Sequence, residues 1–284
     1  MSNALVFDTA SVIIRRFSEK GFSDASDCLA VEAPLEISVC LQSPTGLIRK
    51  NVGTTLRTPG QDGELAIGYL FSLGIIKSRD DVESVSIPNS GNERIELMLR
   101  PHCAHGLDRS QRFGIMNAGC GICGISSLEA MTDVLPVRKP RLPLLLDQHI
   151  IMSLPARIRE QQQLFGKTGG IHAAALFSPS GDLVLLREDI GRHNALDKLI
   201  GCALYDAELQ LQNHILLLSG RAGFELIQKA AMAGIPVVVS VGAPSALAVE
   251  MAKDGQITLI GFLRENRFNL YSEFDKWHQD ETEN

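Results

Sequence analysis

His214-Ile-Leu-Leu-Leu-Ser219 and Pro236-Val-Val-Val-Ser-Val241 are two short apolar runs, and a helical pattern over 222–233 lies between them. A second helical pattern over 245–253 leads to a third apolar run at 257–263. Strands that are apolar throughout are typical of a sheet covered on both faces, and their alternation with helices indicates βαβ crossovers. The sequence therefore predicts an α/β fold with helices on both faces of the sheet.

The pattern changes upstream of these runs. Residues 173–187 predict a hairpin about a turn at 178–182, and a helix is expected over 194–204. Three prolines and three cations between 134 and 146 are unfavourable in a helix or a central strand. We interpret that segment as a connector.

The amino-terminal region is rich in β-branched and turn residues. Residues 36–52 predict a hairpin, and a second hairpin is expected around 89–92. Between them, Asp62 opens a predicted helix of about three turns that Gly74 ends. The predicted organisation is a β-rich N-terminal portion (1–115), a loop and connector (116–146) and an α/β domain (147–284).

The composition is that of a globular protein. Of 284 residues, 45% are hydrophobic, so the chain can bury a sizeable core. The formal net charge of −6 argues against bulk binding of nucleic acid. No signal peptide or membrane-spanning segment is evident. Six cysteines are few for this length, and four of them are scattered without framework spacing, which suits a reducing compartment. We therefore expect a cytoplasmic protein whose partners include neither nucleic acid nor a membrane.

Two thiols stand at a Cys-x-x-Cys spacing in Gly119-Cys120-Gly121-Ile122-Cys123-Gly124. Glycine on each side indicates a pliable loop, and the run Ser126-Ser127-Leu128-Glu129 after it is typical of a capping box that opens a helix. The positive end of a helix favours thiolate over thiol. The pattern suits redox exchange, half of a zinc site or a sulfur relay.

Zinc is the main alternative. His102, Cys103 and His105 lie upstream and, with Cys120 and Cys123, supply enough ligands for a tetrahedral site. A zinc deaminase also needs a His-x-Glu sequence, which does not occur in this chain. The zinc hypothesis is therefore that of a zinc-stabilised scaffold that binds a nucleotide or cofactor without handling sulfur.

Polar clusters follow several predicted strands, where ligands of α/β proteins gather. Arg192 and His193 precede the helix at 194–204, and Arg221 follows the strand at 214–219. Arginine presents a planar fork of donors that suits phosphate, and histidine exchanges protons near neutrality. The last cluster offers aromatic and donor groups that suit a purine nucleotide, in the order Phe262-Leu263-Arg264-Glu265-Asn266-Arg267.

Five motifs together resemble the FdhD family of formate dehydrogenase accessory proteins. They occur in the order Cys120-Gly-Ile-Cys123-Gly, Thr168-Gly-Gly-Ile-His172-Ala-Ala, Glu188-Asp-Ile-Gly-Arg-His-Asn-Ala-Leu-Asp197-Lys, Ser219-Gly-Arg-Ala-Gly-Phe-Glu225 and Gly261-Phe-Leu-Arg-Glu-Asn-Arg267. The likeness covers most of the chain.

The resemblance implies a cytoplasmic sulfurtransferase with a fold similar to cytidine deaminases. Such a protein takes sulfur from a cysteine desulfurase as a persulfide and sulfurates the molybdenum or tungsten of a bis(molybdopterin guanine dinucleotide) cofactor, Mo-bisMGD. Formate dehydrogenase needs that cofactor and is the implied client. Carried over to this chain, Cys120 resembles the persulfide carrier, Cys123 its partner, and the segment 262–267 the cofactor-binding part. A homodimer is also implied, and no permanently bound metal is expected.

Overall fold

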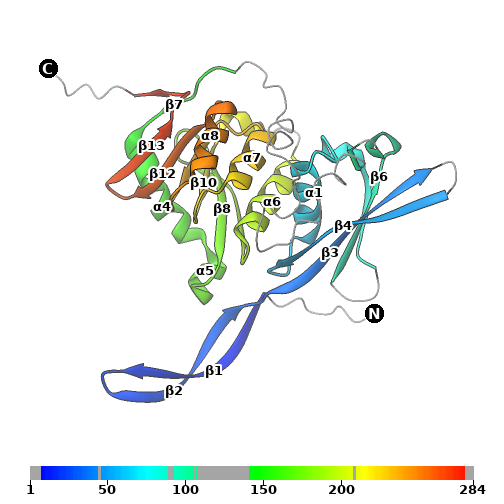
Figure 1. The fold of residues 1–284 in the computed structure, drawn as a ribbon. Helices are drawn as coiled ribbons and strands as arrows, with labels where there is room; N and C mark the ends of the chain where they lie inside the picture. The colour runs from blue at the N-terminus through cyan, green and yellow to red at the C-terminus, as the bar shows by residue number, and fades with distance from the viewer. Residues whose placement is uncertain are drawn as a thin grey trace.

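The computed structural model describes residues 8–43, 46–88, 93–104, 106–107, 141–206 and 209–278. Figure 1 shows two lobes side by side, with a long two-stranded arm reaching away from them. The carboxy-terminal lobe is built on a six-stranded sheet, and the amino-terminal lobe on a four-stranded one.

The six-stranded sheet is mixed. Its strands are β8 (His172–Phe177), β9 (Leu183–Asp189), β10 (Ile215–Leu218), β11 (Val237–Ser240), β12 (Thr258–Arg264) and β13 (Arg267–Ser272), in the spatial order β13-β12-β11-β10-β8-β9. The three strands β10, β11 and β12 are parallel, because a helix connects each to the next, whereas the hairpin partners β8, β9 and β13 run antiparallel to their neighbours.

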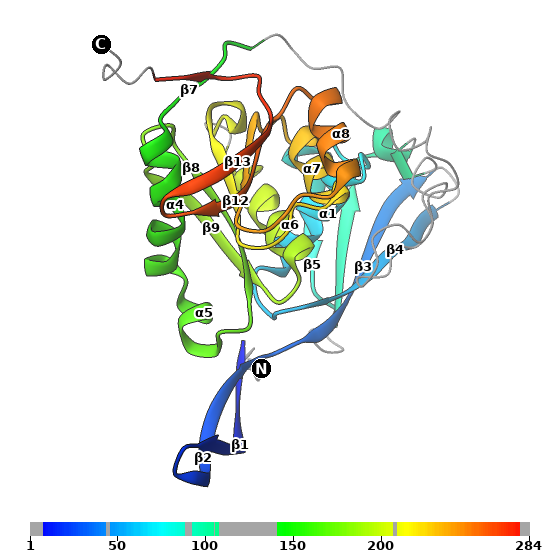
Figure 2. The same ribbon diagram turned by 60° about the vertical axis from the view of Figure 1, so that its left-hand side comes forward.

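Helices cover both faces of this sheet (Figure 2). The helices α6 (Arg192–Ala203), α7 (Phe224–Met232) and α8 (Ala246–Asp254) pack on alternate strand residues of one face, and α4 (Gln148–Gln161) packs on those of the other. The predicted α/β class is therefore confirmed, as are the expected strands and helices over 173–263. Helix α4 was not predicted from the sequence, and Pro155 inside it explains why.

The amino-terminal lobe contains the first hairpin and the helix that the sequence predicts. The strands on either side of the second predicted turn pair antiparallel, while 89–92 themselves lie outside the described residues. Strands β3 (Ala33–Ser43), β4 (Gly46–Arg57), β5 (Val82–Ser86) and β6 (Arg94–Leu99) form the sheet, and α1 (Asp62–Ser72) packs its apolar face on them. Strands β3 and β6 pair in parallel at the centre. The exact boundaries of the predicted domains stay a prediction.

The lobes meet where α1 crosses α6. A Cβ on Gly68 of α1 would collide with the Asp197 carbonyl of α6, and a Cβ on Gly201 of α6 would collide with the Glu64 carbonyl of α1. Two glycines therefore allow the helix backbones to touch. The shorter elements of the chain are α5 (Gln163–Thr168), β7 (Leu145–Leu146), β14 (Lys276–Trp277) and the 3-10 helices Arg79–Asp81, Pro101–Cys103 and Leu211–Asn213.

The arm consists of β1 (Thr9–Ser18) and β2 (Gly21–Ala30), which pair antiparallel along their whole length. Both ribbon views show it extending from the lobes below α5 (Figures 1 and 2). No pattern in the sequence predicts this arm. Among the described residues, no helix is long and apolar enough to cross a membrane.

Candidate functional site

A cavity of about 490 Å³ opens at the edge of the six-stranded sheet where the parallel strands end. Ser219 and Val241, which directly follow β10 and β11, line it, and His172 at the start of β8 completes the sheet side. Arg159 of α4 and Phe165 of α5 contribute to the opposite wall. This is the edge at which the sequence predicted a ligand site.

Two loops that follow β10 and β11 are stacked against each other at this edge. The Gly242 N–H donates to the Gly220 carbonyl over 3.0 Å, and Ala222 N–H donates to Ala243 over 3.2 Å. A Cβ on Gly242 would lie 2.8 Å from the Arg221 backbone, so only glycine permits this approach. Arg221 is exposed on the stacked loops.

The segment 262–267 lies next to the cavity. The Arg264 guanidinium donates to the carbonyl of Val241, a lining residue, over 2.7 Å. Arg264 ends β12 and Arg267 begins β13, so the predicted tail is a tight hairpin turn through Glu265 and Asn266. The structure thus places this cluster at the same edge as Ser219 and Val241.

Phe262 has an unusual backbone for a bulky residue. Its φ is 52°, in the left-handed region, and the register of β12 against β13 shifts between Gly261 and Arg264. Its N–H donates to the Gly242 carbonyl over 3.0 Å, which holds the bulge against the stacked loops. Bulges and strained residues cluster at functional sites because they re-aim side chains. Phe262 as a whole residue is 42% exposed.

His172, which lines the cavity, lies close to Arg192. A Cβ on Gly220 would lie 3.2 Å from the His172 ring and 4.0 Å from Arg192 Cδ, so Gly220 leaves room for both. Burial and the nearby Arg192 cation lower the pKa of His172, which keeps its ring neutral at pH 7. Within the described part of the chain, the buried Arg192 Nε has no hydrogen-bond partner.

His193 points to a different neighbour. Its Nε2 lies 3.1 Å from a Glu225 carboxylate oxygen. That carboxylate favours a charged ring, but burial, reinforced by Lys229 and Arg192, prevails and lowers the pKa of His193 to about 3. A neutral His193 that donates its Nε2–H to Glu225 accounts for both the short contact and the lowered pKa. Contact of Arg192, His193 and Arg221 with a ligand stays a prediction.

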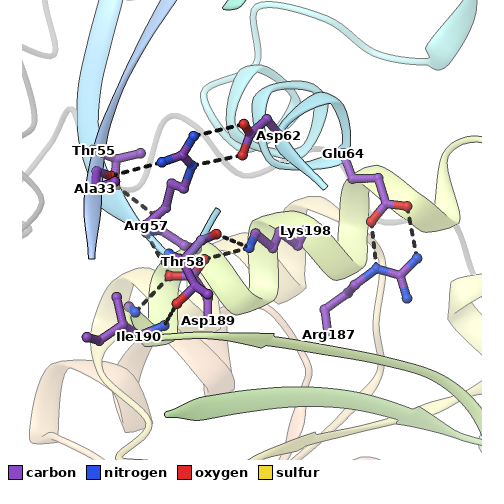
Figure 3. Close-up of polar contacts among 12 residues, drawn as sticks. Ala33, Thr55, Arg57, Thr58, Asp62, Glu64, Arg187, Asp189, Ile190 and Lys198 are labelled. Atoms are coloured by element: carbon purple, nitrogen blue, oxygen red, sulfur yellow. Dashed lines mark hydrogen bonds and ion pairs between the residues drawn. The ribbon is translucent and has the colours of Figure 1, made fainter. Parts of the chain in front are cut away.

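The rest of the motif 188–198 joins the lobes, which the sequence did not reveal. Figure 3 shows Lys198 reaching both the Asp189 carboxylate, 2.7 Å away, and the Thr58 carbonyl, 2.8 Å away. Asp189 also accepts the Thr58 N–H, and Ile190 N–H donates to the Thr58 hydroxyl. Asn194 completes the junction by bonding the end of β4.

Further polar contacts, buried or partly buried, surround this junction. Asp197 accepts from Ser72 of α1 and from Lys229 of α7, so one carboxylate ties three helices together. Arg187 makes a bidentate pair with Glu64 (Figure 3). Glu188, the remaining acidic residue of the motif, accepts the Leu164 and Phe165 N–H groups and so fixes α5, which carries part of the cavity wall.

The upstream half of the suggested zinc site is only partly described. His102 Nε2 lies 2.8 Å from an Asp81 oxygen, and the two are near Cys103. The other Asp81 oxygen accepts the Lys77 and Ser78 N–H groups. Burial, followed by the Asp81 charge, raises the pKa of Cys103. Asp81 therefore has a structural role here already.

Cys120, Cys123 and the expected capping box at 126–129 lie outside the described residues, as does His105. The other four cysteines are free thiols; Cys40 and Cys103 are buried, while Cys28 and Cys202 are partly exposed.

A family model described as FdhD/NarQ matches residues 30–278. The chain belongs to the FdhD/NarQ family. Membership confirms the resemblance drawn from the five motifs, all of which fall within the matched range.

Relatives in the FdhD/NarQ family are similar over nearly their whole length. The sulfur carrier protein FdhD of Sulfurisphaera tokodaii is 41% identical over 87% of this chain and 90% of its own. That of Thermoplasma volcanium is 40% identical over 94% of this chain and 95% of its own. That of Mycolicibacterium paratuberculosis is 42% identical over 88% and 92%.

A solved structure has the same fold. The crystal structure of a candidate formate dehydrogenase accessory protein from Desulfotalea psychrophila matches with a TM-score of 0.70 and 24% identity, covering 93% of this chain and 97% of that one. The two-lobed architecture is therefore that of a solved protein fold.

Proposed function

We propose that this protein is a sulfur carrier that accepts persulfide sulfur from a cysteine desulfurase at Cys120 and delivers it to the metal of Mo-bisMGD, for use by formate dehydrogenase. The observation that carries the proposal is the family match over 30–278, which spans the Cys120-Gly-Ile-Cys123 motif. The relatives' name, sulfur carrier protein, supports the sulfur chemistry.

Loading is a thiol exchange reaction. The Cys120 thiolate attacks the outer sulfur of the donor's persulfide, a new S–S bond forms, and the donor leaves as a thiolate, so no external oxidant is needed. Delivery as sulfide requires two electrons. Attack of the Cys123 thiolate on the inner sulfur of the Cys120 persulfide supplies them, because the two cysteines are oxidised to a disulfide as HS⁻ leaves. The alternative is direct passage of the sulfane atom along the loop.

The cavity at the sheet edge is the proposed site for a nucleotide end of the acceptor. Its volume of about 490 Å³ suits a nucleotide, and Arg159 and neutral His172 line it. Arg264 contacts its wall at Val241, and Phe262, whose N–H donates to the neighbouring Gly242, is exposed. Guanidinium groups bind phosphates, and aromatic faces stack on bases.

The test is mass spectrometry of the whole protein after incubation with a cysteine desulfurase and cysteine. We expect a mass increase of one sulfur atom at Cys120, its loss in Cys120→Ala, and loss of formate dehydrogenase activation in that variant. Cys28→Ala is the control, because Cys28 is a partly exposed thiol outside the Cys-x-x-Cys motif and its loss should not change loading. Equal loading of Cys120→Ala and the wild-type chain would overturn the proposal.

The two delivery routes differ in their product. Closure of a disulfide leaves the spent carrier two hydrogen masses lighter than the dithiol, whereas direct passage leaves the dithiol.

The zinc scaffold remains the alternative function. Metal analysis with His102→Ala and Cys123→Ser separates it, because one equivalent of zinc lost in both variants would favour the scaffold over sulfur transfer.

A further inference from the structure

Three potential metal ligands meet at one end of the four-stranded sheet. Strands β5 and β6 pair antiparallel, and Val82 at the start of β5 lies opposite Leu99 at the end of β6. This register brings the residue before β5 next to the residues after β6. One ligand atom from each of Asp81, His102 and Cys103 lies within 4.8 Å of the other two. No other group of three histidine, cysteine or carboxylate side chains comes together in this way among the described residues.

Backbone hydrogen bonds hold together the two 3-10 helices that carry these side chains. The Arg100 N–H donates to the Asp81 carbonyl over 2.9 Å, and the Cys103 N–H donates to the Arg100 carbonyl over 3.0 Å. Arg100 Nε also donates to the Asp80 carbonyl over 2.6 Å. None of these bonds uses an atom that could ligate a metal, so the backbone preorganises the cluster and leaves its donors available.

The two oxygens of the Asp81 carboxylate have different roles. One accepts the Lys77 N–H over 2.6 Å and the Ser78 N–H over 3.2 Å, and these bonds orient the carboxylate. The other lies 2.8 Å from His102 Nε2. Carboxylates that bind metals are oriented by hydrogen bonds of this kind. The second oxygen and the imidazole nitrogen share a proton, which a metal ion between them can replace.

Cys103 adds a soft donor to this pair. The thiol is buried, and its Sγ lies 3.9 Å from the Asp81 carbonyl oxygen. Packing in the core of the lobe accounts for its burial but not for the carboxylate and imidazole beside it. The His102 side chain is 64% exposed, which gives an ion a route from solvent to the cluster.

One carboxylate oxygen, one imidazole nitrogen and one sulfur form a donor set that suits zinc. Mg²⁺ and Ca²⁺ take oxygen ligands, whereas Zn²⁺ accepts all three donor types. Its bonds of about 2.0 to 2.3 Å point to the corners of a tetrahedron, which sets neighbouring ligand atoms roughly 3.4 Å apart. The 2.8 Å between Asp81 and His102 is slightly shorter, so small side-chain rotations admit the ion.

We propose that Asp81, His102 and Cys103 bind one Zn²⁺ ion, with water at the fourth corner of the tetrahedron. Binding involves no oxidation or reduction, and the Cys103 thiol gives its proton to solvent as it coordinates. The site differs from the zinc scaffold considered above because it uses neither Cys120 nor Cys123. It therefore leaves that motif free, and the inference does not depend on sulfur transfer.

Zinc titration of the full chain by calorimetry tests this site. The chain is first treated with a chelator and carries Cys120→Ala and Cys123→Ala, which remove the motif thiols as competing ligands. We expect one equivalent of zinc to bind. Adding His102→Ala should weaken binding by at least about tenfold, because a ligand is lost. His149→Ala is the matched control, since His149 is also an exposed histidine and should leave binding unchanged.

Cobalt reports the sulfur ligand directly. Co²⁺ bound to a thiolate has a charge-transfer absorption band, which we expect in the chain without motif thiols. Cys103→Ala should abolish the band, whereas Cys40→Ala should keep it, because Cys40 is another buried thiol of the same lobe. Thermal unfolding shows that each variant is folded, and zinc should raise the midpoint only where the site is intact.

Three outcomes would overturn the proposal. The first is an absence of zinc binding once Cys120 and Cys123 are replaced, which would assign any zinc of the wild-type chain to the motif. The second is an equal loss of affinity in His102→Ala and His149→Ala. The third is a cobalt band that survives Cys103→Ala in a folded protein.

Discussion

Gly68 of α1 lies directly against Gly201 of α6, and each glycine occupies space that a side chain on the other helix would need. Helix axes usually stay about 8 to 10 Å apart because side chains separate them. The glycines remove that separation and bring Ser72 and Glu64 within reach of Asp197 and Arg187. The lobes are thus joined by polar bonds that depend on the close approach of the helices.

Gly68→Ala should destabilise the protein strongly. The added methyl group meets the Asp197 carbonyl, which is backbone and cannot move aside alone, so the helices must separate. We expect a loss of about 3 kcal/mol or more in the free energy of unfolding. Chemical denaturation measures it. Gly63→Ala on the same helix is the control, since a Cβ there meets its nearest atoms at an ordinary 3.9 Å and should stabilise the helix slightly.

Lys198→Met should also lower the free energy of unfolding. Lys198 and Asp189 are both completely buried, so removing the cation leaves the Asp189 carboxylate without its charged partner. Breaking a buried pair in this way costs about 3 to 5 kcal/mol, whereas the double change with Asp189→Asn should recover part of the loss. Denaturant midpoints of the three variants test the coupling. If the double variant is as unstable as the two single losses added together, the two side chains are not coupled.

Stability should fall in mild acid because of His193. Its pKa is about 3 in the folded protein, below the usual value near 6.5, so the unfolded chain binds the proton more readily. The stabilisation is fully present above pH 6.5 and is lost as the pH falls toward 3. Between pH 7.5 and 5 the loss is about 1 to 2 kcal/mol. Denaturation of His193→Gln, which keeps a donor for Glu225 but does not titrate, should show a smaller loss over this range.

Nucleotide binding should depend on Phe262 and Arg264. With GDP as the probe, Arg264→Ala should weaken binding about tenfold, as loss of one charge-assisted contact predicts. Phe262→Asn should weaken it similarly, because asparagine keeps the left-handed backbone but lacks the ring. Calorimetry measures both. Lys253→Ala is the control, because Lys253 is an exposed cation at the end of α8. Unchanged GDP binding in Arg264→Ala would contradict the assignment of 262–267 as the nucleotide-binding segment.

The sequence predicts most of the fold, because strands such as 236–241 and helices such as 222–233 are encoded in local patterns. It does not predict the arm, whose strands alternate without one buried face. For the site, residues 219–221 and 262–267 were expected at one edge of the sheet and lie there. That edge follows from the parallel order of the strands.

The motif 188–198 shows where sequence reasoning stops. Its cluster of polar residues suggested a ligand site, yet Asp189, Asn194 and Lys198 bond to residues more than 130 positions earlier. These are Thr55 at the end of β4 and Thr58 just after it. Nothing local to the motif reveals that partner. A buried polar junction and a ligand site draw on the same residue types, and only the tertiary contacts separate them.

Because α1 and α6 touch at Gly68 and Gly201, neither lobe should fold without the other. Cutting away the first lobe would expose the groove along Gly201 to water and strip Lys198 of the Thr58 carbonyl, while Asn194 would lose the strand it holds. Neither half is a module that can be transplanted, and a nick between them should release no folded fragment. Heating should therefore melt the chain in a single step.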